Sequence, residues 1–307
     1  MKNADAPRLF ITGSTGELGR LVVSELLKRV PASSIVAGVR SVDHDVARQI
    51  AAEGIELRIA DYSRPDTLLT AFTGIDRLLL ISSSADHDRV GQHRNVIEAA
   101  KASDVRLFAY TSLLHADTSV LGLGEDHRRT EALLKASGLP VVLLRHGWYM
   151  ENHMASVSPA LQYGAVIGSA GEGRFSTATR ADFAEAAAVV LSTEDQAGRI
   201  YELAGDQSYS LADLADAIAT SAGKPIAYKD MPGAAFKNAL VGMGLPESTA
   251  KLIADSDVAA SKGALEDNDR QLSALIDRPT ASYRQVVEQT VRGLAQPHPT
   301  GSERICS

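Results

Sequence analysis

The sequence predicts an α/β fold, a doubly wound parallel sheet followed by a smaller, mostly helical C-terminal lobe. Three observations support this prediction. Short apolar runs alternate with helix-period segments through the first half of the chain, and the central runs carry no polar face. A glycine-rich turn joins the first apolar run to the first helix. The length of 307 residues suffices for one large domain with a smaller companion.

The first half of the chain alternates strands and helices. Pro31 ends the first helix and Pro65 opens a short one, because proline fits the first turn of a helix but not its interior. The expected strands are 8–12, 35–40, 55–59, 78–81, 107–110 and 141–144. The expected helices between them are 18–27, 42–53, 65–72, 90–102 and 125–137. Right-handed crossovers then place helices on both faces of the sheet.

The second half is less regular. The expected helices are 148–163, 182–192, 211–222, 234–241 and 283–294. Short strands are expected at 200–203 and 226–228. Residues 165–173 are rich in glycine, and 168–173 are expected to form a mobile loop near the cleft rather than a second phosphate loop, because they do not follow a βα alternation.

The domain organisation follows from these segments. Residues 1–150 are expected to form the large domain, to which 175–203 return. Residues 151–174 and 204–294 are expected to form the small substrate-binding lobe. The polar, proline-bearing residues 295–307 are expected to be a flexible tail.

Composition and charge exclude several classes of partner. The net charge is −7, the pI is about 5.6, and no dense block of Lys and Arg occurs, which argues against nucleic acid and acidic membrane surfaces. Cys306 is the only cysteine, so no disulfide framework forms. The N-terminus lacks the apolar core of a signal peptide, and no apolar run reaches the roughly 18 residues of a membrane span. We expect a cytoplasmic protein.

A glycine-rich segment lies directly between the first strand and the first helix. Its residues are Gly13, Ser14, Thr15, Gly16, Glu17, Leu18 and Gly19. Glycines at such a turn let the backbone approach a pyrophosphate, and the helix N-terminus offers unpaired N–H donors. The alternative is an ordinary strand–helix turn, because the spacing is G-x-x-G-x-x-G rather than G-x-G-x-x-G. Its place in the first βα unit favours dinucleotide binding.

Residues at the ends of the next strands predict which dinucleotide binds. The second strand ends in Arg40, where NADH-binding proteins usually carry an acidic residue, and a guanidinium can hold the 2′-phosphate of NADPH. A solvated arginine is the alternative. Asp61 follows the third strand and is either an adenine contact or a helix cap. Ser82 and Ser83 follow the fourth strand and either line the crevice or cap a turn. NADPH is the favoured cofactor.

Five segments carry a resemblance to a known family. They are GSTGELG (13–19), LLLISSS (78–84), QHRNVIEAAK (92–101), AYTSLLHADTS (109–119) and LRHGWYMEN (144–152). The chain resembles the bacterial NADPH:quinone oxidoreductases of the QorB type, which are atypical short-chain dehydrogenases of the NmrA-like group. Triphenylmethane reductase belongs to the same group. The resemblance extends from about Leu9 to Leu294.

The resemblance implies a Rossmann domain, NADPH in the cleft, a quinone as substrate, and neither flavin nor metal. It places the active-site asparagine of the family at Asn152, and the chain departs from the family at His146, where asparagine is expected. The cofactor contacts that it implies are Gly13, Ser14, Thr15, Gly16, Glu17, Leu18, Arg40, Ser82, Ser83, Ser84, Arg145, His146, Gly147, Trp148, Tyr149, Met150, Thr177, Arg180 and Asp182. Asp61 is a further expected contact, from its place after the third strand.

The usual acid–base motif of short-chain dehydrogenases is missing. A Tyr-x-x-x-Lys motif is expected just before the helix that contains Glu131, but the residues there are 123–127, LGEDH. The usual alcohol dehydrogenase mechanism is therefore not expected. Quinone reduction tolerates the loss, because water can protonate the hydroquinone anion while the enzyme aligns donor and acceptor. The run His127-Arg128-Arg129 is expected on a solvated helix face.

Three side chains after the sixth strand are the candidate catalytic residues. Asn152 is either a hydrogen-bond donor to a quinone oxygen or a helix-surface amide. Tyr149, together with Trp148, forms either an aromatic wall over the ring or part of the core. His146, like His115 elsewhere, is a candidate proton donor, although a histidine at a strand end is more often a satisfied hydrogen-bonding residue.

Two other functions are compatible with the sequence. One is reduction of another electron-poor aromatic, such as a triphenylmethane dye. The other is a non-catalytic NADP(H) sensor that binds a regulatory protein, which the missing Tyr-x-x-x-Lys motif allows. A homodimer is the assembly that we consider.

Overall fold

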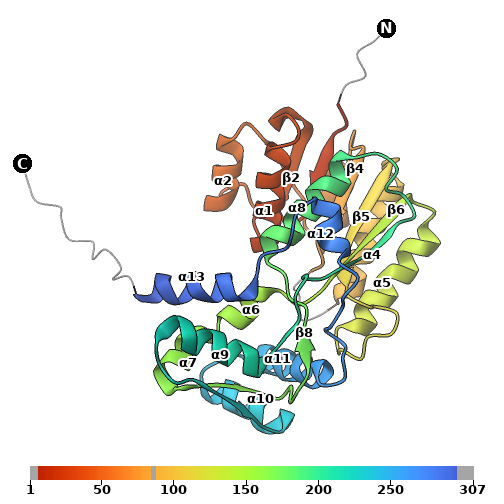
Figure 1. Ribbon diagram of the computed structural model, residues 1–307. Coiled ribbons are helices and arrows are strands. Elements are labelled where there is room, and N and C mark those ends of the chain that lie inside the picture. The colour runs from red at the N-terminus through yellow and green to blue at the C-terminus, as the bar shows by residue number, and fades with distance from the viewer. Residues whose placement is uncertain (1–5, 84–87, 296–307) are drawn as a thin grey trace, which may run out of the picture.

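The computed structural model describes residues 6–83 and 88–295, and a seven-stranded parallel sheet lies at its centre (Figure 1). The strand order is β3-β2-β1-β4-β5-β6-β9. The strands are β1 (Leu9–Ile11), β2 (Ile35–Val39), β3 (Glu56–Ile59), β4 (Arg77–Leu80), β5 (Leu107–Leu113), β6 (Val141–His146) and β9 (Ile200–Leu203). All six predicted strands and the returning strand at 200–203 are confirmed.

The order of the strands positions the functional site. From β1 the chain proceeds outward through β2 and β3, and then crosses back to β4 on the other side of β1. The connections after β1 and β4 therefore leave in opposite directions and open a crevice at the carboxyl ends of these strands, where open α/β sheets bind ligands. Every residue of β1, β2, β4 and β5 is buried, in agreement with their mostly apolar sequences.

Helices cover both faces of the sheet (Figure 1). One layer contains α1 (Glu17–Leu27), α2 (Asp45–Ala52), α8 (Arg180–Ser192) and α12 (Gln271–Ile276). The other layer contains α3 (Pro65–Ala71), α4 (Arg89–Lys101) and α5 (Gly124–Ser137). Small side chains let α8 pack closely on α1, with Ala184, Ala187 and Ala188 all fully buried in the same cluster as Val22 and Leu26 of α1.

The smaller lobe has its own apolar cluster, which includes Tyr209, Leu214 and Val287. Its helices are α6 (Met150–Met154), α7 (Val157–Tyr163), α9 (Leu211–Ala222), α10 (Gly233–Gly242), α11 (Glu247–Ala260) and α13 (Tyr283–Ala295). Its strands are β7 (Ala165–Gly168), β8 (Arg174–Phe175), β10 (Tyr209–Ser210) and β11 (Ala227–Asp230). A short 3-10 helix, Ala32–Ser34, precedes β2 in the large domain.

The second half differs from its prediction in one helix and in several elements that were not predicted. The single helix expected over 148–163 is two short helices, because Tyr149 is extended and bridges to Ala178, and the chain turns again at Ser156. The glycine-rich segment 165–173 begins with β7, a strand that was not predicted and that pairs in parallel with β11 about 60 residues later. Helices α11 and α12 were not predicted.

The position of α12 also changes the expected division into lobes. Its segment falls within 204–294, which the sequence assigns to the small lobe. Leu272 and Ile276 nevertheless pack into the cluster formed by α1, α8 and the main sheet. Helix α8 packs in the same cluster, and β9 pairs in parallel with β6 of the main sheet. Of the expected tail over 295–307, Ala295 is instead the last residue of α13, and residues 296–307 lie outside the described residues.

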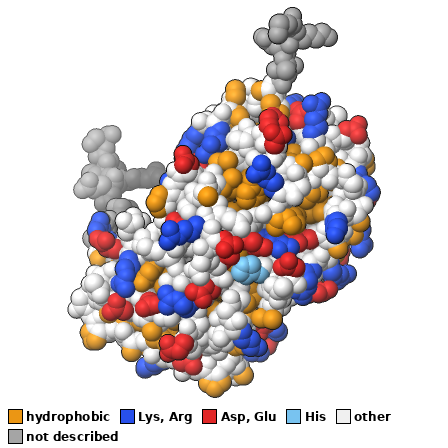
Figure 2. Space-filling view, turned by 45° about the vertical axis from the view of Figure 1, so that its right-hand side comes forward, with side chains coloured by type: hydrophobic (Ala, Val, Ile, Leu, Met, Phe, Trp, Pro, Cys, Tyr) orange, Lys and Arg blue, Asp and Glu red, His pale blue; other side chains and the backbone are white. Residues whose placement is uncertain are grey.

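The charge distribution of the surface concerns binding to nucleic acid, and the length and apolar character of the helices concern a membrane span. On the described part of the face in Figure 2, Lys and Arg are interspersed with Asp and Glu rather than gathered in one basic patch. Over residues 6–83 and 88–295, no helix has the length and apolar character that a membrane crossing requires.

Candidate functional site

The glycine-rich turn forms one wall of a pocket at the crevice. Gly13 has a positive φ of 58°, which favours glycine. The hydroxyl of Ser14 donates to the Ile11 carbonyl at 2.7 Å, and its N–H donates to the Gly38 carbonyl at 3.1 Å. A Cβ on Gly19 would lie 2.2 Å from the Gly13 carbonyl oxygen. The glycine-rich segment is thus in direct contact with the start of α1. This contact brings the N-terminus of α1 to the pocket.

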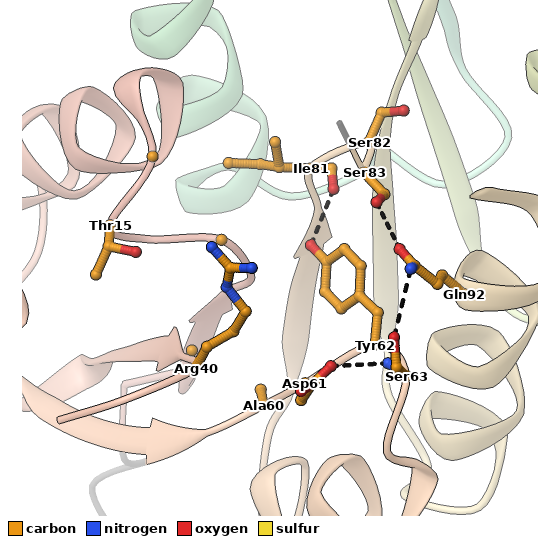
Figure 3. A pocket seen from close by; sticks show the side chains of 13 residues that line it. Thr15, Arg40, Ala60, Asp61, Tyr62, Ser63, Ile81, Ser82, Ser83 and Gln92 are labelled. Atoms are coloured by element: carbon orange, nitrogen blue, oxygen red, sulfur yellow. Dashed lines mark hydrogen bonds between the residues drawn. The ribbon is translucent and has the colours of Figure 1, made fainter. Parts of the chain in front are cut away.

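The pocket measures about 260 Å³ and joins the ends of four strands (Figure 3). Its lining residues are Gly13, Thr15, Gly16, Gly38, Arg40, Ala60, Asp61, Tyr62, Ser63, Ile81, Ser82, Ser83 and Gln92. Seven of these were predicted as cofactor contacts from the sequence, so the structure brings that set together. Ser84 lies outside the described residues.

Several lining residues were missed by the sequence analysis. Tyr62 and Ser63 directly follow Asp61, so the end of β3 should have been taken as a segment rather than as one residue. Gln92 lies in the family-like segment 92–101, but nothing in its spacing shows that it faces the pocket. The hydroxyl of Tyr62 hydrogen-bonds to the Thr12 hydroxyl and donates to the Ile81 carbonyl at 2.9 Å. Tyr62 therefore links the ends of three strands.

Arg40 and Asp61 occupy different roles in this pocket. The Arg40 side chain extends into the pocket between the glycine-rich turn and Tyr62 (Figure 3). Among the described residues, no carboxylate is ion-paired with Arg40. Asp61 lines the pocket and also accepts a hydrogen bond from the Ser63 N–H at 2.9 Å. The cap of α3 is Arg64, so the interpretation of Asp61 as the helix cap is wrong.

A second group of predicted residues meets around Arg180, the first residue of α8. Its Nε lies 3.1 Å from Oε2 of Glu17, and its Nη1 lies 3.3 Å from Oε2 of Glu151. Its guanidinium carbon lies 4.6 Å from the centre of the Tyr149 ring. Its Nη2 donates to Oδ1 of Asn152 at 3.3 Å. Arg180 therefore connects the N-terminus of α1 with the segment that carries the candidate catalytic residues.

His146 lies in the core beneath this group. It is 3% exposed and stacks on Phe183 with ring centres 4.4 Å apart. Its Nδ1 lies 3.3 Å from the Tyr149 hydroxyl, and its Nε2 has no hydrogen-bond partner among the described residues. Burial lowers the pKa of His146 to about 3 and raises the pKa of Tyr149 to about 12. Near neutral pH the imidazole is therefore neutral and the phenol protonated.

Two other histidines differ from their expected roles or surroundings. His115 has a positive φ of 51°, and its Nε2 lies 3.1 Å from Oδ2 of Asp267, so it already has a carboxylate partner. The expectation that His127 lies on a solvated face is wrong. His127 is 6% exposed, and its Nδ1 lies 2.8 Å from the hydroxyl of Tyr110 on β5. Helix α5 turns this residue toward the sheet, whereas Arg129 is exposed.

The other predicted contacts have clear structural surroundings. Arg145 binds both carboxylate oxygens of Glu131, at 3.0 and 2.7 Å, and Glu202 at 2.7 Å. The Thr177 hydroxyl lies 3.0 Å from the Tyr209 hydroxyl, and Asp182 forms a capping box at the start of α8. Leu18, Trp148 and Met150 pack in apolar clusters, and the Gly147 N–H donates to the Leu203 carbonyl. Cofactor contacts by these residues remain predictions.

Comparison with known proteins identifies the family. Residues 13–194, more than half of the chain, match the model of a family described as NAD(P)H-binding. The chain belongs to this NAD(P)H-binding family, and within it to the group that contains quinone oxidoreductase 2. Quinone oxidoreductase 2 of Escherichia coli (strain K12) is 50% identical over 279 residues, which cover 91% of this chain and 97% of that relative.

Solved structures agree in fold over nearly the whole chain. The crystal structure of an NADPH-dependent quinone oxidoreductase from Escherichia coli, complexed with NADPH, has a TM-score of 0.89 at 49% identity and covers 92% of this chain and 99% of its own. Triphenylmethane reductase from Citrobacter sp. has a TM-score of 0.88 at 33% identity, over 93% of this chain and 99% of its own. The Rossmann-type fold is thereby confirmed.

We expect the free energy of unfolding to fall steeply below pH 6.5. Burial lowers the pKa of His93, His127 and His146 to about 3 and that of His153 to about 4, so these groups take up protons only on unfolding. Burial raises the pKa of Asp257 to about 7, which releases about one proton on unfolding and opposes the effect. Unfolding near pH 5 therefore takes up a net total of about three protons. The free energy of unfolding then falls by about 4 kcal/mol for each pH unit of acidification.

Urea unfolding between pH 6.5 and pH 5 measures this slope. His153→Gln is the matched variant, because it removes one of the four buried imidazoles and should lower the slope by about one proton. A stability that is constant over this range would show that the histidines are not held neutral.

Proposed function

We propose that this protein is an NADPH-dependent oxidoreductase that reduces quinones. The observation that carries the proposal is the pocket in which Arg40 meets the glycine-rich turn, beside the group formed by Arg180 and Asn152. The similarity to quinone oxidoreductase 2 supports the substrate class. We further propose a cytoplasmic location, because the lone Cys306 is compatible with a reducing compartment.

The residues of the pocket fit NADPH. Backbone N–H groups at Thr15, Gly16 and the start of α1 would bind the diphosphate, because Gly19 allows the turn and the helix to lie in contact. Arg40 would bind the 2′-phosphate, since it enters the pocket without a carboxylate partner among the described residues. When bound, NADPH would supply the hydride that reduces the quinone.

Asn152 is the residue that we assign to the quinone oxygen. A guanidinium only donates hydrogen bonds, so Arg180 fixes Oδ1 of Asn152 toward itself and leaves the Nδ2 hydrogens for another acceptor. The exposed Asn152 amide can then donate to a quinone oxygen as negative charge develops there. Glu17 and Glu151 neutralise the charge of Arg180, so its role is to hold the amide in this orientation.

Neither Tyr149 nor His146 is an effective acid for the proton that follows. Tyr149 has a pKa raised to about 12 by burial, and His146 is neutral because burial lowers its pKa to about 3. We therefore assign protonation of the product to water, and to Tyr149 the role of a rigid aromatic surface beneath Arg180. This assignment explains why the site functions without a Tyr-x-x-x-Lys motif.

Purified protein should oxidise NADPH when 1,4-benzoquinone or a naphthoquinone is added, because the site aligns donor and acceptor. The loss of absorbance at 340 nm measures the rate. A triphenylmethane dye serves as the competing acceptor, and faster turnover with the dye would change the substrate class. Tight NADPH binding without turnover on any acceptor would favour a non-catalytic sensor.

Arg40→Ala should weaken NADPH binding by about tenfold or more and leave NADH binding nearly unchanged, because only NADPH carries the 2′-phosphate. Isothermal titration calorimetry with both coenzymes measures the difference. Arg106→Ala is the control, because Arg106 immediately precedes β5 and so lies at the amino end of that strand, whereas the pocket lies at the carboxyl ends of the strands. An equal loss for both coenzymes would remove Arg40 from the 2′-phosphate site.

Asn152→Ala should lower kcat for quinone reduction by about tenfold to a hundredfold, because one donor to the developing charge is lost. The affinity for NADPH should stay within about twofold, since the amide is not assigned to the cofactor. Asn238→Ala, which removes an exposed amide from α10, is the matched control. Unchanged turnover in Asn152→Ala would exclude the residue from the reaction.

A further inference from the structure

The loop that follows β4 is held in an unusual way. Residues Ile81, Ser82 and Ser83 line the pocket, and each of their three backbone N–H groups donates to a side chain from a different element. The acceptors are Oγ1 of Thr12 at 3.0 Å, Oγ1 of Thr111 at 2.8 Å and Nε2 of His93 at 3.0 Å, respectively. The backbone of this loop is therefore fixed by side-chain acceptors rather than by a neighbouring strand.

His93 provides the last of these acceptors from the first turns of α4. The side chain is fully buried, and its Nδ1 lies 2.9 Å from the Thr130 hydroxyl. That hydroxyl donates its own hydrogen to the Asp126 carbonyl at 2.9 Å, so it must accept from Nδ1–H. The contacts thus specify one neutral tautomer, with the hydrogen on Nδ1 and a lone pair on Nε2 toward Ser83. A second hydrogen on Nε2 would oppose the Ser83 N–H.

The same helix holds the opposite wall of the pocket. Nδ2 of Asn95 donates to the Tyr62 carbonyl at 2.8 Å. Gln92 lies between the walls, where its Oε1 accepts from the Ser83 hydroxyl at 2.5 Å and its Nε2 donates to the Ser63 hydroxyl at 3.4 Å (Figure 3). Two turns of α4 therefore contact both the segment after β3 and the segment after β4.

We propose that His93 is a positioning residue of the cofactor pocket. As a neutral imidazole it accepts a hydrogen bond from the Ser83 N–H and so holds the loop after β4 in the conformation that binds the cofactor. Asn95 holds the segment after β3 in the same way. The proposal rests on the NADPH binding proposed above. Without these bonds the two walls must be ordered when the cofactor binds, and that ordering lowers affinity. His93 does not touch the reacting atoms.

Three variants of α4 test the proposal. His93→Leu removes the acceptor, whereas His93→Gln can return an amide oxygen to the position of Nε2. Asn95→Asp keeps the shape of the side chain but replaces the donor facing the Tyr62 carbonyl with an acceptor. Leu134→Ala is the control for general destabilisation, because Leu134 is 1% exposed in the apolar cluster that includes Val96 and Ile97 of α4, and it does not line the pocket.

The first measurement uses the cofactor-free protein. Hydrogen–deuterium exchange should show that peptides covering 81–83 exchange on the order of tenfold faster in His93→Leu, and at close to the normal rate in His93→Gln and Leu134→Ala. The second measurement is the Kd for NADPH by calorimetry, which should rise on the order of tenfold in His93→Leu and Asn95→Asp and stay within about threefold in His93→Gln.

The outcomes separate this proposal from the proposed function. Protection of 81–83 that is unchanged in His93→Leu, or a Kd in that variant no higher than in Leu134→Ala, would overturn the role of His93. If His93→Leu does not fold, a normal Kd in Asn95→Asp would overturn the proposal instead. A wild-type protein that binds NADPH but reduces no quinone would overturn the reductase function alone, since neither measurement uses a quinone.

Discussion

The contact between the glycine-rich turn and the first turn of α1 is the constraint on which the rest of the site depends. A Cβ at Gly19 would lie 2.2 Å from the Gly13 carbonyl oxygen and 2.8 Å from Cα of Ser14, distances that no side chain can accept. Only with glycine there can α1 begin directly beside the end of β1. The N-terminus of the helix then faces the point where the strand order reverses, and the pocket opens between β1 and β4.

The walls of that pocket are built by side chains that complete the hydrogen bonds of the strand ends. A strand that stops at a crevice leaves backbone N–H groups without a neighbouring strand, and each needs an acceptor if it is buried. Thr12, Thr111 and His93 supply these acceptors after β4, and Tyr62 joins the same segment to the end of β3. The polar residues at the strand ends thus stabilise the fold and also shape the ligand pocket. A single residue there therefore has a structural and a functional role at once.

The sequence predicted the large domain well and the smaller lobe poorly, and the reason is the range of the interactions involved. The alternation of apolar strands with helices is a local pattern, and the turn around Gly13 needs only its own neighbours. In contrast, β7 exists because it pairs with β11, and α12 joins the main core through Leu272 after the chain has passed through the small lobe. The burial of His127 depends on how α5 is rotated against β5, which its polar neighbours Arg128 and Arg129 conceal.

For the site, strand-end residues were predictable and the connections between them were not. Arg180 was named from a resemblance, but its central place follows only from the packing of α8 against α1, which brings the guanidinium within 3.1 Å of Glu17 and 3.3 Å of Asn152. This arginine joins the helix that would bind the diphosphate to the amide that would meet the quinone. In a site without the Tyr-x-x-x-Lys pair, the role proposed for this amide is to stabilise negative charge on the acceptor by a hydrogen bond without providing a proton. Such a site suits quinones, because the hydroquinone anion is stable enough to be protonated later by water. It does not suit simple ketones, because their alkoxide needs an acid within the site.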